Sequence, residues 1–426
     1  MISYLAYLRA ACFGLFIVSA SAAGAENVAS ASGELTLPQA IAVALERNPE
    51  LQVSVYELRA ADARITQAGL RPNPELGLEL ENFAGDGDLS GADALETTLS
   101  LSQVIELGGK RSRRVDLAAL ERDDKSIERQ ALQLDVLAQV TRRFVEVVVA
   151  QEQLSLMRDA SGLAEKTLAA IKTRVEAART PQAEQSRAAI ALTRARLAQR
   201  QTEVALESTR RSLIALWGDT TPAFATARAD LFTLTPTRNL ETLTANVQRN
   251  PDFLRFASEA RLRAAELELA RAQAKPDLTL GAGLRRLEQS GDTALVAGVS
   301  LPLALFNRNQ GAIREAEARH EQTEAAKQAA LIRANATLFA LYQELLQNRA
   351  AVETLRSEAR PQAQAALEQT QYGYERGRFS YLELAATQQE LIEVQRAAIE
   401  SAANYHRLLA EIERLTGEAL AQPQGN

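Results

Sequence analysis

Cysteine and histidine are almost absent from this chain, with one cysteine and two histidines in 426 residues. Cys12 lies in an N-terminal apolar run. His320 and His406 are isolated on predicted helices, with neither an H-E-x-x-H motif nor a cysteine beside them, and we expect both to be solvated or interhelical polar residues. Gly108-Gly109 lacks the Lys-Ser/Thr spacing of a phosphate-binding loop. We therefore predict that the protein is not an enzyme and has no cofactor and no resident metal site.

Aromatic residues are also scarce, and negative charge exceeds positive charge. Only 5% of the residues are aromatic, and the formal net charge is -6. Without a basic surplus to neutralise phosphates, nucleic acid is not an expected partner. Few aromatics among abundant Ala, Leu, Glu, Gln and Arg are typical of long, closely packed helices.

The N-terminus has the pattern of an export signal. Arg9 is the only charge before Glu26, residues 10–20 are apolar, and residues 23–25 (Ala-Gly-Ala) fit a cleavage site. The alternative, a membrane anchor, is disfavoured because the run is short. We expect residues 1–25 to be removed together with Cys12, which lacks a lipidation motif because a charge stands where an apolar residue is required. Residues 26–34 are expected to be flexible, and no later window has 18 uninterrupted apolar residues.

A strand that leads directly into a long helix is predicted within residues 94–115. Leu99 and Leu101 alternate with polar residues, which is the period of a strand with one apolar face. After Gly108-Gly109, apolar residues recur every seven positions, and no proline occurs before residue 181. A helix over about 65 residues would be roughly 100 Å long.

The pattern then repeats along the chain. Asn48-Pro49 recurs as Asn250-Pro251, an offset of 202, and Ser100-Leu101 recurs as Ser300-Leu301, an offset of 200. We interpret this as an internal duplication. The predicted units are a first repeat over 35–218 (strand hairpin 74–107, helical hairpin 110–217), a linker over 219–236, a second repeat over 237–418 (strand hairpin 276–305, helical hairpin 309–417) and a tail over 419–426.

Both kinds of hairpin are amphipathic. In the first strand Leu76, Leu78 and Leu80 share one face, which we expect to contact lipid, while Glu75, Glu79 and Glu81 share the other. The helices carry apolar residues at heptad spacing: Ala183, Ile190, Leu197 and Val204; Leu331, Leu338, Leu345 and Val352; Leu384, Leu391, Ala398, Tyr405 and Ile412.

Four strands cannot close a barrel, and an open edge cannot lie in lipid. Eight strands would close as a dimer and twelve as a trimer, and periodicity does not choose between them. Alone, the helices fit an ordinary soluble coiled coil and the hairpins fit a small β-domain. The combination of an export signal, a duplication and amphipathic hairpins beside long helices favours a channel.

The chain resembles the TolC-type outer-membrane efflux proteins, closest to the outer-membrane subunits of cobalt–zinc–cadmium-type cation efflux systems. The resemblance lies in residues 35–51, 70–78, 100–115 and 372–391, and the narrower match in residues 106–111. It implies a mainly α protein with a membrane β-barrel. Three chains, each with four strands and four long helical segments, would form a twelve-stranded barrel that continues into a twelve-helix periplasmic α-barrel.

The resemblance also implies function and partners. A homotrimer in outer-membrane lipid of a Gram-negative bacterium would work with a periplasmic adaptor and an inner-membrane pump, which we expect to be proton-driven. It would be the passive exit duct for divalent heavy-metal cations. A type I protein-secretion or drug-efflux duct of the same fold is one alternative, and a soluble periplasmic coiled-coil adaptor is another.

The closed end of such a duct is expected at the turns over 177–182 and 373–380. Glu383 matches an acidic position of the family's constriction, whereas the second acidic position is Ala386 here, and Glu184 is the repeat equivalent of Glu383. The alternative for Glu383 is a helix N-terminal carboxylate favoured by the dipole. The remaining candidates are Arg376 and Arg378 at the gate, Gly373, Gly377 and Pro181 as tip hinges, and Gly108, Gly109, Lys110 and Arg111 at the strand–helix junction.

Overall fold

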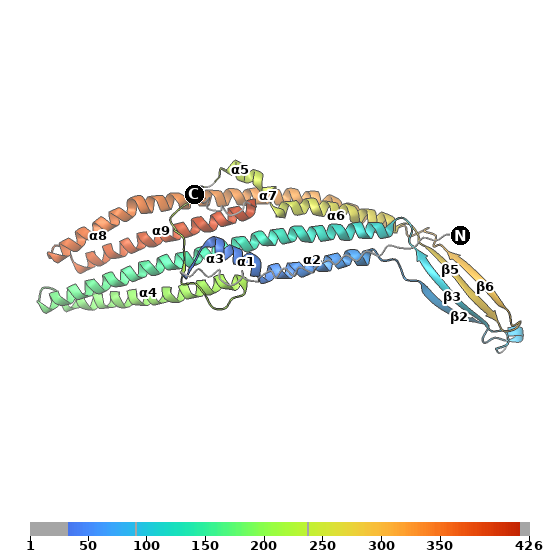
Figure 1. Cartoon of the computed structure of the whole chain (residues 1–426). Helices are drawn as coiled ribbons and strands as arrows, with labels where there is room; N and C mark the ends of the chain where they lie inside the picture. Colours follow the sequence, from blue (N-terminus) through green and yellow to red (C-terminus); the bar gives the residue numbers. More distant parts are fainter. Residues whose placement is uncertain (1–32, 90–91, 237, 418–426) are drawn as a thin grey trace, which may run out of the picture.

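The computed structural model describes residues 33–89, 92–236 and 238–417. The predicted signal peptide with Cys12, most of the predicted flexible segment and the predicted tail lie outside these residues. The described chain is a long rod in which helices run side by side and a four-stranded sheet projects at one end (Figure 1). The fold is mostly helical, as the sequence predicted.

The elements of the second half follow those of the first in nearly the same order. A short helix and a longer one precede each strand hairpin, and a helical hairpin follows it. In chain order the elements are β1 (Glu34–Leu35), α1 (Leu37–Arg47), α2 (Pro49–Ala68), β2 (Glu75–Glu81), β3 (Glu96–Ile105), α3 (Lys110–Glu176), α4 (Gln182–Ile214), β4 (Thr226–Ala227), α5 (Leu240–Val247), α6 (Pro251–Gln273), β5 (Leu278–Leu287), β6 (Thr293–Ser300), α7 (Gln310–Thr354), α8 (Arg360–Glu375) and α9 (Tyr381–Thr416).

The longest helix, α3, spans 67 residues without a proline and is therefore about 100 Å long. Its return partner α4 has only 33 residues and covers about half of that length. The sequence predicted four long helical segments, and two shorter helices lie in line with them. Helix α2 continues the row of α4 along α3, and α6 likewise lies beyond the end of α9 (Figure 1). Between α7 and α8 the helix widens to a π-turn at Leu355–Ala359, because Pro361 has no N–H to donate.

Two buried asparagines join these helices end to end. The Asn48 side chain accepts a hydrogen bond from Leu51 N–H at 3.0 Å and donates one to the Leu216 carbonyl at 2.8 Å. Asn250 accepts from Asp252 N–H at 2.9 Å and donates to the Leu415 carbonyl at 3.0 Å. Each amide therefore satisfies the N-terminus of one helix and the C-terminus of the helical hairpin that follows in the same repeat. The recurring Asn-Pro pair marks this junction.

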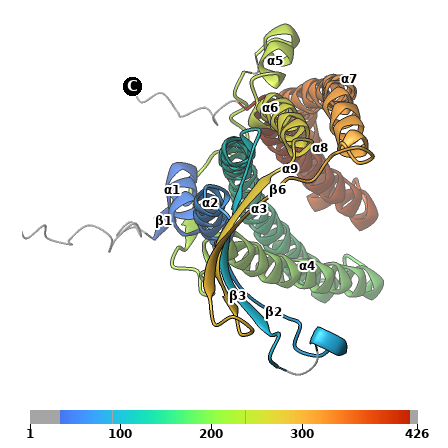
Figure 2. The ribbon, with the colours of Figure 1, turned by 90° about the vertical axis from the view of Figure 1, so that its right-hand side faces the viewer.

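The sheet has the order β2-β3-β5-β6, with every neighbouring pair antiparallel. Its register aligns Leu78 with Leu99, Leu284 and Leu295, so leucines from all four strands share one face. Glu79 and Arg285 lie on the opposite face. The predicted alternation of each strand is confirmed, and the curved sheet leaves β2 and β6 as open edges within the described chain (Figure 2).

The predicted heptad positions differ in burial from helix to helix. On α7 and α9 the predicted residues pack inside the chain, among them Leu338, Leu345 and Tyr405, each fully buried. On α4 the predicted heptad positions Ile190, Leu197 and Val204, called the α4 stripe, are more than half exposed. This helix instead packs on α3 through other positions, including Leu192 and Leu206.

A second exposed heptad, the α7 stripe, consists of Ile332, Phe339 and Leu346. Helix α7 runs on the opposite side of the rod from α4, with α3 and α9 between the two helices (Figures 1 and 2). Within the described residues, every helix is either too short or too polar to cross a membrane.

The asparagine junction can be tested by Asn48→Asp. Aspartate keeps the acceptor for Leu51 N–H but loses the donor to the Leu216 carbonyl, which we expect to cost about 1–3 kcal/mol in the free energy of unfolding. Thermal unfolding followed by circular dichroism measures this loss. Asn239→Asp at the N-cap of α5, where the side chain accepts from Thr242 N–H in an exposed position, is the matched control. Equal losses in the two variants would contradict the role of Asn48.

Candidate gate at the helical tips

The turns α3–α4 and α8–α9 lie together at the end of the rod far from the sheet (Figure 1). Helices α3 and α8, which lead into these turns, end in the same way. Arg179 N–H bonds to the Arg174 carbonyl and Arg378 N–H to the Gly373 carbonyl, each at 2.8 Å. The left-handed residue that this turn requires is Gly377 in the second repeat and Ala178, with φ of 56°, in the first. The offset of 199 therefore relates two copies of one turn.

Gly373 is explained by packing. It is buried inside α8, and a Cβ on it would lie 2.2 Å from Cδ2 of the Phe379 ring. Gly377 ends the helix through its positive φ of 73°, and Pro181 is the extended N-cap residue of α4. Close contact with Phe379 therefore gives a packing reason for glycine at position 373, and its role as a hinge stays a prediction.

Arg174 connects the two hairpin tips. Its Nη1 donates to the carbonyl of Tyr374 at 3.1 Å and to that of Glu375 at 3.0 Å, at the C-terminus of α8. The guanidinium also lies over the Tyr374 ring, 4.9 Å from its centroid. A cation here satisfies terminal carbonyls and complements the helix dipole. Sequence analysis missed Arg174, although a basic residue in the last turn of a helix was an available signal.

Glu184, in the first turn of α4, faces the other hairpin. The Tyr374 hydroxyl donates a hydrogen bond to Glu184 Oε2 at 3.5 Å, the limit for such a bond. Burial raises the pKa of Tyr374, and the negative charge of Glu184 raises it further. Tyr374 is therefore a neutral donor held between Arg174 and Glu184.

Glu383 caps α9. Its carboxylate accepts hydrogen bonds from the backbone N–H of Ser380 at 2.7 Å and from the Ser380 hydroxyl at 2.8 Å. These two bonds lower the pKa of the fully exposed Glu383 carboxyl below its ordinary value. Within one chain the carboxylate has the geometry of a capping box. Nearby, the Arg376 guanidinium lies 3.8 Å from the centroid of Tyr372, and Arg378 is exposed.

The strand–helix junction is remote from the tips and is held by a different set of bonds. Gly108 has a φ of 76°, and a Cβ on it would lie 2.6 Å from Cδ of Lys275. Lys110 Nζ lies 2.7 Å from Asp277 Oδ1, which also accepts a hydrogen bond from Leu107 N–H at 3.0 Å. These contacts attach the first repeat to the start of β5. Gly109 is the left-handed N-cap of α3, and Arg111 is exposed.

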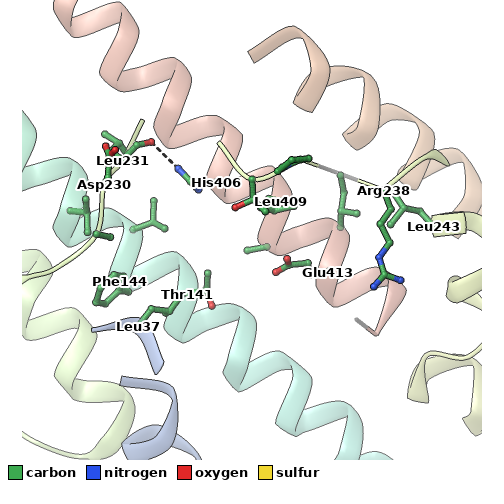
Figure 3. Close-up of a pocket in the computed structure, with 17 residues that line it drawn as sticks. Leu37, Thr141, Phe144, Asp230, Leu231, Arg238, Leu243, His406, Leu409 and Glu413 are labelled. Carbon is green, nitrogen blue, oxygen red and sulfur yellow. Dashed lines mark hydrogen bonds between the residues drawn. The ribbon is translucent and has the colours of Figure 1, made fainter. Parts of the chain in front are cut away.

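A cavity of about 340 Å³ lies between α3, α9 and the linker, near the middle of the rod (Figure 3). Its lining includes Leu37, Phe144, Leu231 and Leu409. His406, also in the lining, was expected to be solvated or interhelical, but its Nε2 lies 2.8 Å from the Leu231 carbonyl of the linker. Burial lowers the pKa of His406, although this carbonyl and the charge of Asp230 oppose the shift. The neutral His406 side chain therefore holds the linker against α9 through this hydrogen bond.

His320 is exposed on α7. Among the described residues, no three His, Cys, Asp or Glu side chains are grouped so that they could hold a metal ion.

Comparison with known proteins gives matches over most of the chain. The family model of the outer membrane efflux proteins matches residues 40–219 and 243–418. The chain is 29% identical over 391 residues, 91% of each chain, to the cobalt-zinc-cadmium resistance protein CzcC of Cupriavidus metallidurans. It is 23% identical over 330 residues to the nickel-cobalt-cadmium resistance protein NccC of Alcaligenes xylosoxydans, covering 77% of this chain and 74% of that one. The outer membrane protein VceC of Vibrio cholerae has the same fold, with a TM-score of 0.71 at 20% identity over 89% of this chain and 96% of that one.

The His406 contact predicts a pH dependence. Because the pKa of His406 is lower in the folded than in the unfolded chain, the folded state is favoured when the ring is neutral, and stability is lost as pH falls below about 6.5. His406→Gln should therefore show a smaller fall in the thermal midpoint between pH 7 and pH 5 than the wild type. His320→Gln, at an exposed position, should behave as the wild type. If the thermal midpoint of His406→Gln falls between pH 7 and pH 5 as much as that of the wild type, this assignment is contradicted.

Proposed function

The chain belongs to the outer membrane efflux protein family, and we propose that three copies of it form the exit duct of a tripartite efflux pump. The duct has a twelve-stranded barrel in the outer membrane of a Gram-negative bacterium and a twelve-helix tunnel in the periplasm. It receives cargo from a periplasmic adaptor and a proton-driven inner-membrane pump. Its conduction is passive.

One observation carries this proposal: the sheet has a leucine face, a polar face and two open edges. Unpaired N–H and C=O groups along β2 and β6 each cost several kcal/mol in hydrocarbon. Copies of the chain satisfy both edges when β6 of one pairs with β2 of the next. The leucine face then contacts lipid, and the polar face lines the lumen.

The exposed helical stripes support the same assembly. The α4 stripe and the α7 stripe each present three large apolar residues at heptad spacing, on helices that run on opposite sides of the rod. Such spacing is typical of a seam between helices. Each stripe is buried when copies stand side by side around one axis, so the strands and the helices close the ring together.

The lumen favours cations. The polar face of the sheet carries four carboxylates, from Glu75, Glu79, Glu81 and Glu96, and one guanidinium, from Arg285. Excess negative charge along a narrow pore raises the local concentration of cations. Together with the similarity to CzcC, this supports divalent heavy-metal cations as cargo.

The gate is at the helical tips. The candidate gate residues lie in or next to the two turns there: Glu383, Glu184, Arg376 and Arg378. The Arg174 bonds to the Tyr374 and Glu375 carbonyls hold one hairpin against the other, so opening of the tip requires them to break. The three Glu383 carboxylates of a trimer form an acidic ring at the constriction.

The orientation of the sheet is tested by Leu78→Arg and Glu79→Gln in a strain that lacks the gene. An arginine on the lipid face costs about 2–4 kcal/mol at the bilayer midplane, so Leu78→Arg should lose outer-membrane assembly and fail to restore growth in cobalt, zinc or cadmium. Glu79→Gln should assemble and restore resistance. Membrane fractionation and growth curves measure both effects. Equal behaviour of the two variants would overturn the assignment, and a wild-type gene that restores no resistance would overturn the cargo.

The gate is tested by Glu383→Gln in single-channel recordings. Glutamine removes the charge but keeps a capping box, as Gln39 does with Thr36 in α1. Loss of the acidic ring should reduce selectivity for cations and weaken block by trivalent cations from the periplasmic side. Glu400→Gln, about 25 Å further along α9, is the control. Unchanged selectivity and block in Glu383→Gln would move the gate to Glu184 or to the turn over 373–382.

A further inference from the structure

The last strand of the sheet ends earlier than the duplication predicts. β3 continues to Ile105, whose counterpart at the offset of 200 is Leu305, but β6 ends at Ser300. The strand pattern nevertheless continues through Leu301, Leu303 and Leu305, which are 46%, 75% and 64% exposed. Residues 301–305 thus have the alternation of a strand without its pairing.

The end of β3 shows which pairing is missing at the end of β6. β2 begins at Glu75 opposite Ser102, so the last three residues of β3 pair only with β5. There Gln103 lies opposite Leu280, and Ile105 lies opposite Leu278. The first repeat therefore completes its second strand by using the first strand of the next repeat. β6 has no next repeat within its own chain.

We propose that residues 301–305 complete β6 by pairing antiparallel with β2 of a second copy of this chain, with Leu303 opposite Leu78. The register follows from carrying the β3–β5 pairing to the next repeat, with offsets of 200 for β3 and 202 for β5. It also sets Leu301 opposite Leu80, and Leu305 opposite Leu76. This inference rests on the proposed trimeric channel and specifies how its barrel closes.

The hydrogen-bond phase of the sheet supports this register. Glu288 N–H bonds to the Leu95 carbonyl, and Leu287 N–H bonds to the Asp292 carbonyl, each at 3.0 Å. Because bonded pairs alternate in antiparallel ladders, odd-numbered residues of β3 bond to β5, and even-numbered residues of β6 bond to β5. The edge-facing backbone groups then belong to residues 301, 303 and 305 of the β6 segment and to residues 76, 78 and 80 of β2. In the single chain Leu305 N–H bonds to the Leu303 carbonyl at 2.8 Å, and this local bond opens when residues 303 and 305 pair with β2. The proposed register pairs these two sets with each other.

Pro302 fits the same geometry. As an even-numbered residue its nitrogen faces β5, which begins only at Leu278, opposite Leu301. The missing N–H therefore lies on the side without a partner and leaves the new seam intact. The register also places leucine beside leucine on the apolar face, whereas a slip of one residue would bring Glu79 among them.

Disulfide trapping tests the register directly. Cys12 is the only cysteine of the sequence, so pairs can be introduced in a Cys12→Ala background. Opposed residues of a bonded pair have Cα atoms about 5.5 Å apart, within the range of a disulfide. Leu303→Cys with Leu78→Cys, and Leu305→Cys with Leu76→Cys, should give covalent trimers on oxidation, seen on non-reducing gels. The crossed pair Leu305→Cys with Leu80→Cys is displaced by four residues, about 13 Å, and should give at least fivefold less covalent trimer.

Each outcome is decisive. In-register yields at least fivefold above those of the crossed pair and of each single variant support the proposal. A crossed pair that links as well as the in-register pairs overturns the register, and so does a trimeric protein in which no pair links. A monomeric mass in detergent overturns the proposed channel first, and the register with it, so the two failures are distinguishable.

Discussion

The length of the molecule depends on one interaction that occurs twice: a buried asparagine side chain that bonds two helix ends at once. Asn48 and Asn250 are 4% and 1% exposed, and each accepts from the start of one helix and donates to the end of another. Without a partner such an amide would be costly inside the protein. With it, α4 and α2 form one row along the full length of α3. The rod therefore carries the two hairpin tips and the sheet at opposite ends.

The second constraint is that the chain cannot satisfy its own surfaces. Within the described chain β2 and β6 have open edges, and the α4 and α7 stripes expose apolar heptads on helices that run on opposite sides of the rod. Inside the chain the first repeat completes its strand pairing with the second, through the β3–β5 ladder and the Lys110–Asp277 ion pair. In the proposed trimer the same need at the other edges is met by another copy, so that assembly continues the packing between the repeats.

Much of this was predictable because period and repetition are properties of the sequence itself. The strand faces followed from the alternation around Leu78, and the long helix α3 followed from the absence of proline. The fate of the α4 stripe was not predictable, because heptad spacing identifies a seam without saying which helix fills it. Arg174 and His406 were missed or misjudged because their partners, carbonyls about 200 and 175 residues away in sequence, are set by tertiary structure. The packing of Gly373 was missed for the same reason, since the Phe379 ring is placed against it by the turn that follows α8.

The central claim is that the chain is complete only as a ring of three. The most direct measurement is the protein mass of the detergent-solubilised complex, obtained by light scattering with the detergent contribution separated. The account predicts the mass of three chains, in which twelve strands close one barrel and both apolar stripes are covered. A mass of one or two chains under conditions that preserve the folded protein would contradict it.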